Sequence, residues 1–377
     1  MIDHLPYGVF RHAQGPRCAA RWGDHLLDLH AAESHGHVRA EGTLLAENLD
    51  RFLAAGVSLH SRVRQELLDL AANGIPPELL VPLDGAELLL PFTVADYVDF
   101  YSSENHAANV GQIFRPGQPP VPPNWRHLPI GYHGRAGTVV VSGTPIRRPT
   151  GLLAPGKVGP CQRLDIEAEV AFVVATPSTP GTPVPPSSFR DHVFGVVLLN
   201  DWSARDIQAF EYQPLGPFLG KSFATSISPW ITPLAALHDA WVPAPVQDPP
   251  VVEHLADDPH LGLDLHLSVE WNGVEVSRPP FATLYWTPAQ QLAHMTSNGD
   301  TLRTGDLFAS GTVSGPSRDE VGSFLELTWG GAEPVDLGSA KRTFLEDGDT
   351  VTIRATAPGA RGTVVELGSV SGTIVGS

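Results

Sequence analysis

Three carboxylates at alternate positions are the first residues in this sequence whose spacing suggests chemistry. Asp165, Glu167 and Glu169 stand at every second position of QRLDIEAEVAF, with apolar residues between them. On a β-strand such residues share one face and stand only about 7 Å apart, so their charges repel one another. Acids on the solvent face of an edge strand are one explanation. The other is a divalent cation, Mg²⁺ or Ca²⁺, held by carboxylates, with Asp201 as a further ligand.

A second group of polar residues lies in NDWSARDIQAFEY. Asp201, Arg205, Gln208 and Tyr212 have the spacing of one face of a helix. A solvated face with an Asp201–Arg205 ion pair is one interpretation. The alternative is a polar stripe that points into a site, because apolar residues at the other positions predict that the helix contacts protein on several sides.

Two histidines are candidates for a general base. His106 lies in DFYSSENHAANVG and His133 in GYHGRAG, among sixteen histidines in the chain. Either imidazole can accept a proton near neutral pH. Composition does not choose between them.

The stretch LGPFLGKS resembles a phosphate-binding loop but does not match one. Gly216 and Gly220 are one residue too close for that motif, and the segment follows a predicted helix rather than a strand. The sequence therefore argues against nucleotide binding. Lys221 remains a candidate for stabilising an oxyanion or enolate.

The elements that must position these residues fall into two predicted domains. A helix is expected over SLHSRVRQELLDLAANG, with Ser58 as its cap and Gly74 at its end. Prolines then break the pattern at about residues 75–90. We therefore expect an N-terminal domain over 1–88 and a catalytic, metal-binding domain over 89–377.

The second domain is predicted to be mainly β, within an α+β chain. LDLHLSVEWNGVEVS alternates apolar and polar residues and turns at Asn272 and Gly273, a strong hairpin signal. A helix is expected over TPAQQLAHMTSNG, with Thr287 as the cap, Pro288 at its first position and Gly299 after its end.

Composition excludes several classes of protein. The chain has 377 residues and a net charge of −17, which disfavours nucleic acid and anionic membranes as partners. Two isolated cysteines predict neither a zinc site nor a disulfide framework. We see no signal peptide and no apolar run long enough to span a membrane, and we expect a soluble cytoplasmic protein.

Several longer motifs together resemble the fumarylacetoacetase family. They occur in the family's order from about residue 91 to the end of the chain, whereas the first 90 residues resemble it only weakly. The NDWSARD…SPW block is the most specific of them. The motifs are DFYSSENHAANVG, NWRHLPIGYHGRAGTVVVSGTPIRRP, LDIEAE, GVVLLNDWSARDIQAFEYQPLGPFLGKSFATSISPW, GDLFASGTVSGP and GSFLELTWGG.

The resemblance implies a fold and an activity. It implies an N-terminal SH3-like β-barrel domain followed by a C-terminal mixed β-sandwich roll that holds the active site, in a homodimer. It also implies hydrolysis of a carbon–carbon bond in 4-fumarylacetoacetate, a dianionic β-diketone, to fumarate and acetoacetate. This is the last step of tyrosine and phenylalanine catabolism, and the cofactor would be Mg²⁺ or Ca²⁺.

Site residues follow from the resemblance, motif by motif. The implied metal ligands are Asp99, Glu167, Glu169 and Asp201. The implied catalytic residues are His106 as base, Glu326 as the acid that orients it, and Arg205, Gln208 and Lys221 as stabilisers of negative charge. The implied substrate contacts are Tyr101, Arg115, Tyr132, Gln208, Tyr212 and Thr312. Lys221 and Thr225 match a second, structural cation site, whereas Asp165 matches no ligand and is expected to be a surface acid.

Two other functions are compatible with these residues. A hydrolase of acylpyruvates or other β-diketones could use the same metal site. A non-catalytic calcium-binding β-protein, in which the acids are structural and His106 is incidental, would leave Arg205, Gln208 and Lys221 without a role.

Overall fold

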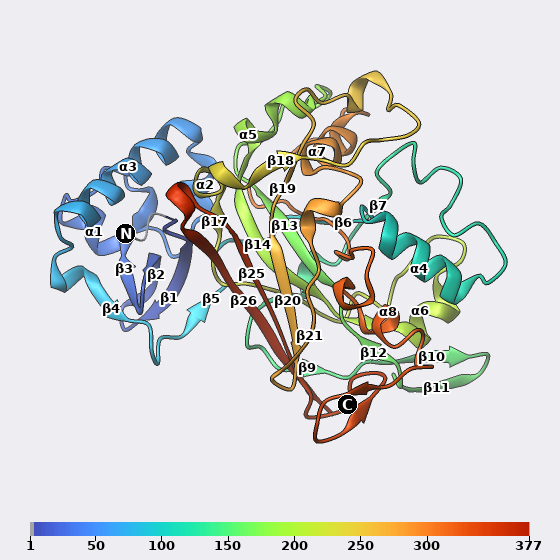
Figure 1. The fold of residues 1–377 in the computed structure, drawn as a ribbon. Coiled ribbons are helices and arrows are strands. Elements are labelled where there is room, and N and C mark those ends of the chain that lie inside the picture. The colour runs from blue at the N-terminus through green and yellow to red at the C-terminus, as the bar shows by residue number, and fades with distance from the viewer. Residues whose placement is uncertain (1–3, 377) are drawn as a thin grey trace.

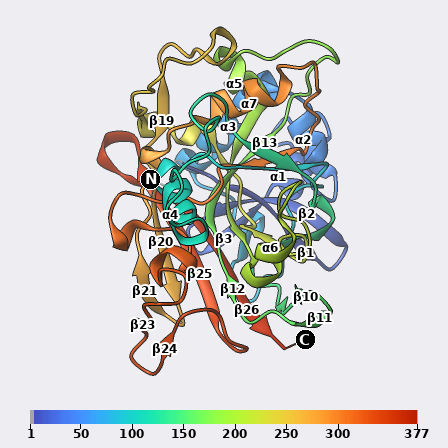
Figure 2. The same cartoon turned by 90° about the vertical axis from the view of Figure 1, so that its right-hand side faces the viewer.

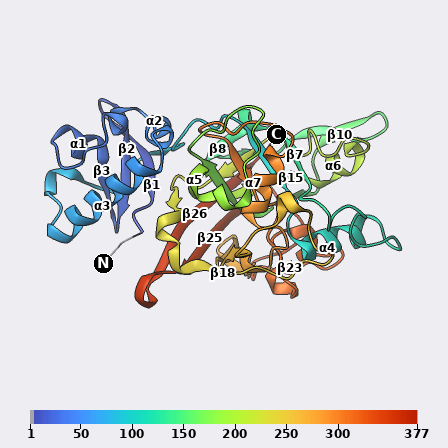
Figure 3. The same cartoon turned by 90° about the horizontal axis from the view of Figure 1, so that it is seen from above.

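The computed structural model describes residues 4–376, which form a smaller N-terminal domain beside a larger, strand-rich domain (Figures 1 and 3). In the N-terminal domain an antiparallel sheet has the strand order β4-β3-β2-β1-β5. Its strands are β1 (Tyr7–His12), β2 (Gly15–Trp22), β3 (His25–Asp28), β4 (Leu80–Pro82) and β5 (Leu88–Leu89). Three helices accompany it: α1 (Leu29–Ser34), α2 (Asp50–Ala54) and α3 (Val57–Asn73).

The N-terminal sheet is open. Its edge strands β4 and β5 are not hydrogen-bonded to each other among the described residues, so the expected SH3-like barrel is not confirmed. The predicted helix is present as α3, and Gly74 ends it at φ 96°. Ser58 is not its cap, because the helix begins at Val57 and Ser58 lies inside it. Gly56, at φ 83°, occupies the cap position.

The larger domain is built on an eight-stranded mixed sheet with the order β7-β6-β22-β13-β14-β16-β8, and β17 also pairs with β14. These strands are β6 (Tyr97–Phe100), β7 (Gly131–His133), β8 (Val139–Val141), β13 (Ala168–Val174), β14 (Val193–Asp201), β16 (Thr225–Ile227), β17 (Thr232–Pro233) and β22 (Leu307–Ala309). We call it the central sheet.

A second sheet, with the order β21-β20-β25-β26-β9, lies beside the central sheet, and its long strands β25 and β26 cross the domain (Figure 1). Its strands are β9 (Ile146–Arg147), β20 (His266–Trp271), β21 (Val274–Ser277), β25 (Thr350–Pro358) and β26 (Val364–Val375). Four two-stranded sheets complete the domain: β10 (Thr150–Ala154) with β11 (Lys157–Pro160), β12 (Leu164–Asp165) with β15 (Ser203–Ala204), β18 (Trp241–Pro243) with β19 (Leu261–Leu263), and β23 (Val335–Asp336) with β24 (Lys341–Arg342).

Short helices flank the sheets, and α4 and α6 lie on the same side of the molecule (Figure 2). The helices of this domain are α4 (Glu104–Phe114), α5 (Phe189–His192), α6 (Arg205–Glu211), α7 (Pro288–Thr296) and α8 (Phe324–Leu327). The predicted cap and first residue of α7 are confirmed, with Thr287 in a capping box and Pro288 at the first position. The predicted hairpin is also confirmed, because β20 and β21 are joined by Asn272 and Gly273, both at positive φ. No helix among residues 4–376 is long and apolar enough to cross a membrane.

The central sheet separates two apolar cores. On β13, Val170 and Phe172 face a core shared with the second sheet, whereas Ala171 and Val173 face a core shared with the N-terminal domain. Phe52 of α2 lies in this second core. The alternation of a strand between its two faces thus places the N-terminal domain on one face of the central sheet.

Two further local predictions are wrong. Residues 165–169 do not form one strand, because β12 ends at Asp165 and β13 begins at Ala168. Asp201 lies at the end of strand β14 rather than on a helix. The backbone N–H of Asp201 donates to the carbonyl of Glu167 at 3.1 Å, so pairing between distant segments outweighs the helical spacing.

Candidate active site

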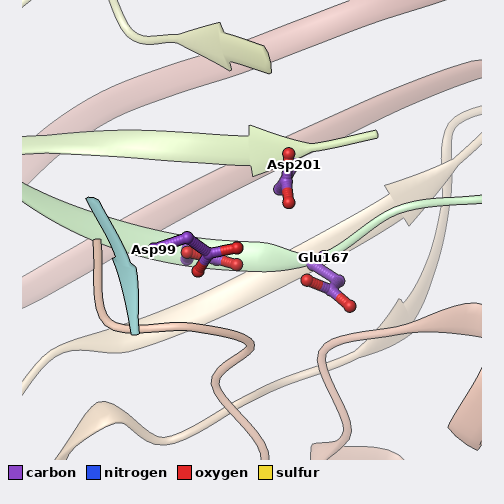
Figure 4. A group of neighbouring side chains, drawn as sticks. Asp99, Glu167 and Asp201 are labelled. Carbon is purple, nitrogen blue, oxygen red and sulfur yellow. The ribbon is translucent and has the colours of Figure 1, made fainter. Parts of the chain in front are cut away.

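Four buried carboxylates converge at one end of the central sheet. Asp99 lies on β6, Glu167 immediately before β13, Glu169 on β13 and Asp201 at the end of β14. One oxygen from each lies within 4.8 Å of the others, and all four side chains are buried. Figure 4 shows Asp99, Glu167 and Asp201 in this group. We call the four residues the acidic cluster.

Three cationic side chains contact the acidic cluster. The ammonium of Lys221 lies 2.6 Å from Glu167 and 2.7 Å from Asp201. The guanidinium of Arg205 lies 2.8 Å from Glu167. Arg135 also pairs with the cluster, through Asp201 and Asp99, although it was not among the predicted site residues.

Two carboxylate oxygens of the cluster have no hydrogen-bond partner among the described residues. They are Oδ1 of Asp99 and Oε1 of Glu169, and both atoms are buried. A buried anionic oxygen without a donor carries a large desolvation cost. The carboxylate donor set and these two free oxygens fit a hard divalent cation, which binds oxygen ligands.

The pKa values of Asp99 and Glu169 reflect the same shortage of positive charge. Burial raises the pKa of Asp99 to about 6, with Arg135 acting against the shift. Burial and the charges of Asp99 and Glu167 raise the pKa of Glu169 well above its usual value. For Glu167 burial acts in the same direction, but the charges of Lys221 and Arg205 outweigh it and hold the pKa well below the usual range.

A histidine–carboxylate pair lies beside the acidic cluster. Nδ1 of His106 is 2.7 Å from Oε2 of Glu326, and Nε2 lies 3.9 Å from Oε1 of Glu167. The cap of α4 positions the imidazole, because the backbone N–H of His106 donates to the hydroxyl of Ser103. Burial acts against ionisation of Glu326, but the charge of His106 and hydrogen bonds lower its pKa.

The other candidate base lies elsewhere. The side chain of His133 is 60% exposed and 3.2 Å from Asp96. It does not line the cavity that contains His106. Of the two histidines left open by the sequence, only His106 is placed to act beside the acidic cluster.

A cavity of about 330 Å³ opens onto this group. Its lining includes two buried polar groups without a hydrogen-bond partner among the described residues, Nη2 of Arg205 and Oγ1 of Thr312. Both are therefore available to a ligand. The predicted site residues that line the cavity are Asp99, Tyr101, His106, Arg115, Tyr132, Glu167, Arg205, Gln208, Tyr212, Lys221 and Thr312.

The remaining predicted site residues lie behind the cavity wall. Glu169 and Asp201 belong to the acidic cluster, Glu326 contacts His106, and the hydroxyl of Thr225 donates to Asp201 at 3.0 Å. Because the Lys221 ammonium is itself cationic, only its backbone oxygen could ligate a second cation near Thr225.

The expectation for Asp165 is wrong. This residue is fully buried, and it accepts hydrogen bonds from Nε of Arg205 at 2.7 Å and from the backbone N–H groups of Phe324 and Leu325. The alternative Asp201–Arg205 ion pair is not formed either. Asp165 instead orients Arg205 and binds the start of α8, the helix that carries Glu326.

Comparisons with known proteins identify the family of the chain. Residues 3–91 match the family described as Fumarylacetoacetase N-terminal, and residues 96–375 match Fumarylacetoacetate (FAA) hydrolase C-terminal. The chain is 44% identical to fumarylacetoacetase of Homo sapiens, covering 93% of this chain and 90% of that protein. It is 42% identical to the Arabidopsis thaliana enzyme, covering 100% and 96%.

Solved structures share the fold at low identity. Fumarylacetoacetate hydrolase from psychrophilic Exiguobacterium antarcticum superposes with a TM-score of 0.61 at 18% identity, covering 99% of this chain and 100% of that one. Maleylpyruvate hydrolase from Sphingobium sp. SYK-6, in complex with manganese(II) and pyruvate, superposes with a TM-score of 0.56 at 15% identity, covering 99% and 100%. Because the two family descriptions match residues 3–91 and 96–375, and because curated fumarylacetoacetases are 42–44% identical over nearly the full chain, this chain belongs to the fumarylacetoacetase family.

Proposed function

We propose that this chain is a fumarylacetoacetase, which hydrolyses 4-fumarylacetoacetate to fumarate and acetoacetate in tyrosine and phenylalanine catabolism. The observation that carries the proposal is the His106–Glu326 pair, which lies beside the acidic cluster at one cavity, in a chain 44% identical to a curated fumarylacetoacetase. The cavity combines a base, a cation site and cationic groups for a dianionic substrate.

The cation would be held by the acidic cluster, Asp99, Glu167, Glu169 and Asp201. When bound, Mg²⁺ or Ca²⁺ would supply a Lewis acid and a template for the diketone oxygens. We assign Thr225 and the backbone of Lys221 to the implied second cation site. The Thr225 hydroxyl and the Lys221 ammonium both contact Asp201, the residue shared by the two sites in this assignment.

His106 is assigned as the general base. With Nδ1–H donating to Glu326, the lone pair on Nε2 is free to accept a proton from water. The hydroxide oxygen then bonds to the ketone carbonyl carbon of the fumaryl group, and the carbonyl electron pair moves onto its oxygen. The carbon–carbon bond breaks, its electron pair leaves with the acetoacetate enolate, and the proton taken by His106 is available to that carbon.

Cationic and amide groups are assigned to offset charge on the substrate oxygens. Nη2 of Arg205 is free for this role, because Asp165 and Glu167 occupy its other nitrogens. Gln208 accepts a hydrogen bond from Arg205 at 3.2 Å through its carbonyl oxygen, which leaves its amide N–H groups for the substrate. Lys221 has a third N–H beyond its two carboxylate contacts.

The substrate's remaining contacts are assigned to the cavity lining. Arg115 is suited to a terminal carboxylate, which a guanidinium can bind in bidentate fashion. Thr312 offers a hydroxyl without a partner among the described residues. The other assigned contacts are Tyr101, Tyr132 and Tyr212.

Family membership also supports finer expectations. We propose a homodimer in the cytoplasm that needs neither nucleic acid nor a membrane. The second sheet with its neighbours would correspond to the β-sandwich roll. Domain limits at 1–88 and 89–377 remain predictions, and β5 (Leu88–Leu89) spans that junction.

The test is hydrolysis of fumarylacetoacetate by the purified protein, with fumarate and acetoacetate both measured, with and without a chelator. We expect equal amounts of the two products, and loss of both with the chelator. A panel of acylpyruvates and shorter diketones tests the alternative hydrolase. A folded, cation-loaded protein that turns over none of them would overturn the proposal in favour of a calcium-binding protein.

A further inference from the structure

Arg135 makes the most extensive contacts with the acidic cluster of any residue to which no role has been given. Its Nη1 lies 2.8 and 2.9 Å from the two oxygens of Asp201, and its Nη2 lies 2.7 Å from Oδ2 of Asp99 and 3.2 Å from the hydroxyl of Tyr132. The Tyr132 hydroxyl donates to the same Asp99 oxygen at 2.8 Å. One guanidinium thus links two cluster carboxylates and a residue that lines the cavity.

The surroundings of Arg135 fix its position. Its side chain is only 6% exposed, and Cζ lies 4.7 Å from the ring centre of Tyr97 and 4.9 Å from that of Tyr132. Cation–π contacts with two rings favour one orientation of the planar fork. The guanidinium is therefore held by two aromatic rings and by the hydrogen bonds of Nη1 and Nη2.

The backbone at Arg135 is strained. It adopts φ 75° and ψ 3°, a left-handed conformation that is uncommon for a residue with a side chain. Thr138, three residues later, donates to the carbonyl of Ser222 at 2.9 Å and so connects this turn to the segment that carries Lys221. Local strain of this kind persists where the surrounding contacts determine the conformation.

The contacts of Arg135 leave a cation site open. The guanidinium takes Oδ2 of Asp99 but leaves Oδ1 without a donor, and it does not contact Oε1 of Glu169. Within the described residues, the four negative charges of the cluster are offset by Arg135, by Lys221 and in part by Arg205. The charge of Arg205 is shared between Glu167 and Asp165. A divalent ion brings this group close to neutrality, whereas removal of Arg135 would leave one more negative charge.

We propose that Arg135 is a positioning residue that holds Asp99 and Asp201, and that its fixed charge makes the acidic cluster selective for divalent over trivalent cations. The proposal rests on the proposed cation site but not on the identity of the substrate. La³⁺ is a suitable probe, because it resembles Ca²⁺ in size and in its preference for oxygen ligands.

The test is calorimetric titration of the chelator-treated full chain with Ca²⁺ and with La³⁺. Arg135→Met and Arg135→Gln remove the charge, Arg135→Lys keeps it without the fork, and Arg11→Met removes a guanidinium from an exposed ion pair with Glu87. We expect the ratio of La³⁺ affinity to Ca²⁺ affinity to rise about tenfold or more in the neutral variants, because a trivalent ion gains more from one added negative charge. In Arg135→Lys and Arg11→Met the ratio should stay within about threefold of wild type.

Two results would contradict the selectivity role. An equal loss of affinity for both ions in the neutral variants would show a merely structural residue, and unchanged affinities would show no role at all. If a neutral variant does not fold alone, we expect saturating La³⁺ to restore its folding. Failure of both neutral variants to fold with La³⁺ would equally overturn the proposal.

The positioning role has its own readout. We expect Arg135→Lys to lower kcat while it keeps the ion selectivity, because a lysine cannot bridge Asp99, Asp201 and Tyr132 at once. An unchanged kcat would contradict that role. Failure of the wild-type chain to bind Ca²⁺ would instead count against the proposed cation site itself.

Discussion

One face of the central sheet contains two regions with opposite chemistry. On β13, Glu169 and Val173 lie on that face. On β14, Asp201 and Val197 lie on the same face. The acidic cluster occupies one end, beside the cavity. The other end, which we call the apolar half, packs against the N-terminal domain through Tyr97, Val173, Val197, Leu199 and Leu307.

The difference between the two regions shows what each part of the strand faces. The alternation of a strand decides which side chains share a face. Along that face, apolar residues contact the N-terminal domain, and acidic residues lie where the cavity begins. The N-terminal domain stabilises the apolar half by excluding water. The acidic cluster has the opposite need, because its carboxylates require cations rather than apolar neighbours. The two regions should therefore respond differently to substitution.

The largest expected effect is loss of turnover without loss of the fold. Substitution His106→Ala removes the proposed base and should lower kcat by roughly 10²–10⁴-fold. Cation affinity and the unfolding temperature should stay close to wild type, because His106 is not a proposed ligand. Steady-state kinetics and calorimetry measure both. As the control, His133→Ala should be near normal, and near-normal turnover of His106→Ala would move the base elsewhere.

The converse effect is expected where the N-terminal domain packs against the apolar half. Phe52 is fully buried and its ring lies 5.3 Å from that of Tyr7 and 5.7 Å from that of Phe194. Phe52→Ala should lower the free energy of unfolding by about 3–5 kcal/mol, as measured by urea denaturation. Cation affinity of the folded protein should be unchanged. A large loss of affinity here would show that the two regions are not separable. Val57→Ala, at a side chain that is 46% exposed, is the matched control.

A smaller effect is expected from one ligand of the acidic cluster. Glu167→Gln removes one charge from the proposed ligand set and should weaken cation binding by about tenfold or more. Unchanged affinity in a calorimetric titration would remove Glu167 from the ligands. Glu87→Gln, at an exposed acid of the N-terminal domain, should bind the cation normally.

The smallest effect concerns pH. Burial lowers the pKa of His60, whose Nε2 lies 2.8 Å from the carbonyl of Phe52. The folded state disfavours the protonated His60 ring, whereas the unfolded chain can protonate it with a pKa of about 6.5. The protein is therefore more stable above that pH and loses stability as the pH falls below it. His60→Phe should therefore show a smaller drop in unfolding temperature between neutral and mildly acidic pH. An equal drop in both proteins would exclude His60 as a source of the acid sensitivity.

Two elements of the larger domain could be predicted from the sequence because their signals are local. The Asn272–Gly273 turn and the Thr287 capping box depend on neighbouring residues, and both are present. The helical spacing from Asp201 to Tyr212 was misleading, because Asp201 is held on β14 by pairing with a distant segment. Whether the N-terminal sheet closes into a barrel likewise depends on pairing between strands that are distant in sequence, which local patterns do not reveal.

The candidate site shows the same division. Resemblance placed the acidic cluster and His106 together. In the structure Asp99, Glu167 and His106 line one cavity, and Glu169 and Asp201 complete the cluster without lining it. Asp165 was missed because its partners, Arg205 and the start of α8, are remote in sequence. Arg135 was missed for the same reason, although the glycines around it in GYHGRAG, one of which, Gly134, is at positive φ, were a usable signal of unusual backbone.

The most direct measurement is the hydrolysis rate of the chelator-treated protein as Ca²⁺ or Mg²⁺ is restored, with cation occupancy followed by calorimetry in the same samples. If the cation compensates the acidic cluster and completes the active site, release of fumarate and acetoacetate should rise in proportion to occupancy. Full hydrolysis by protein without bound cation would contradict the proposed role of the acidic cluster.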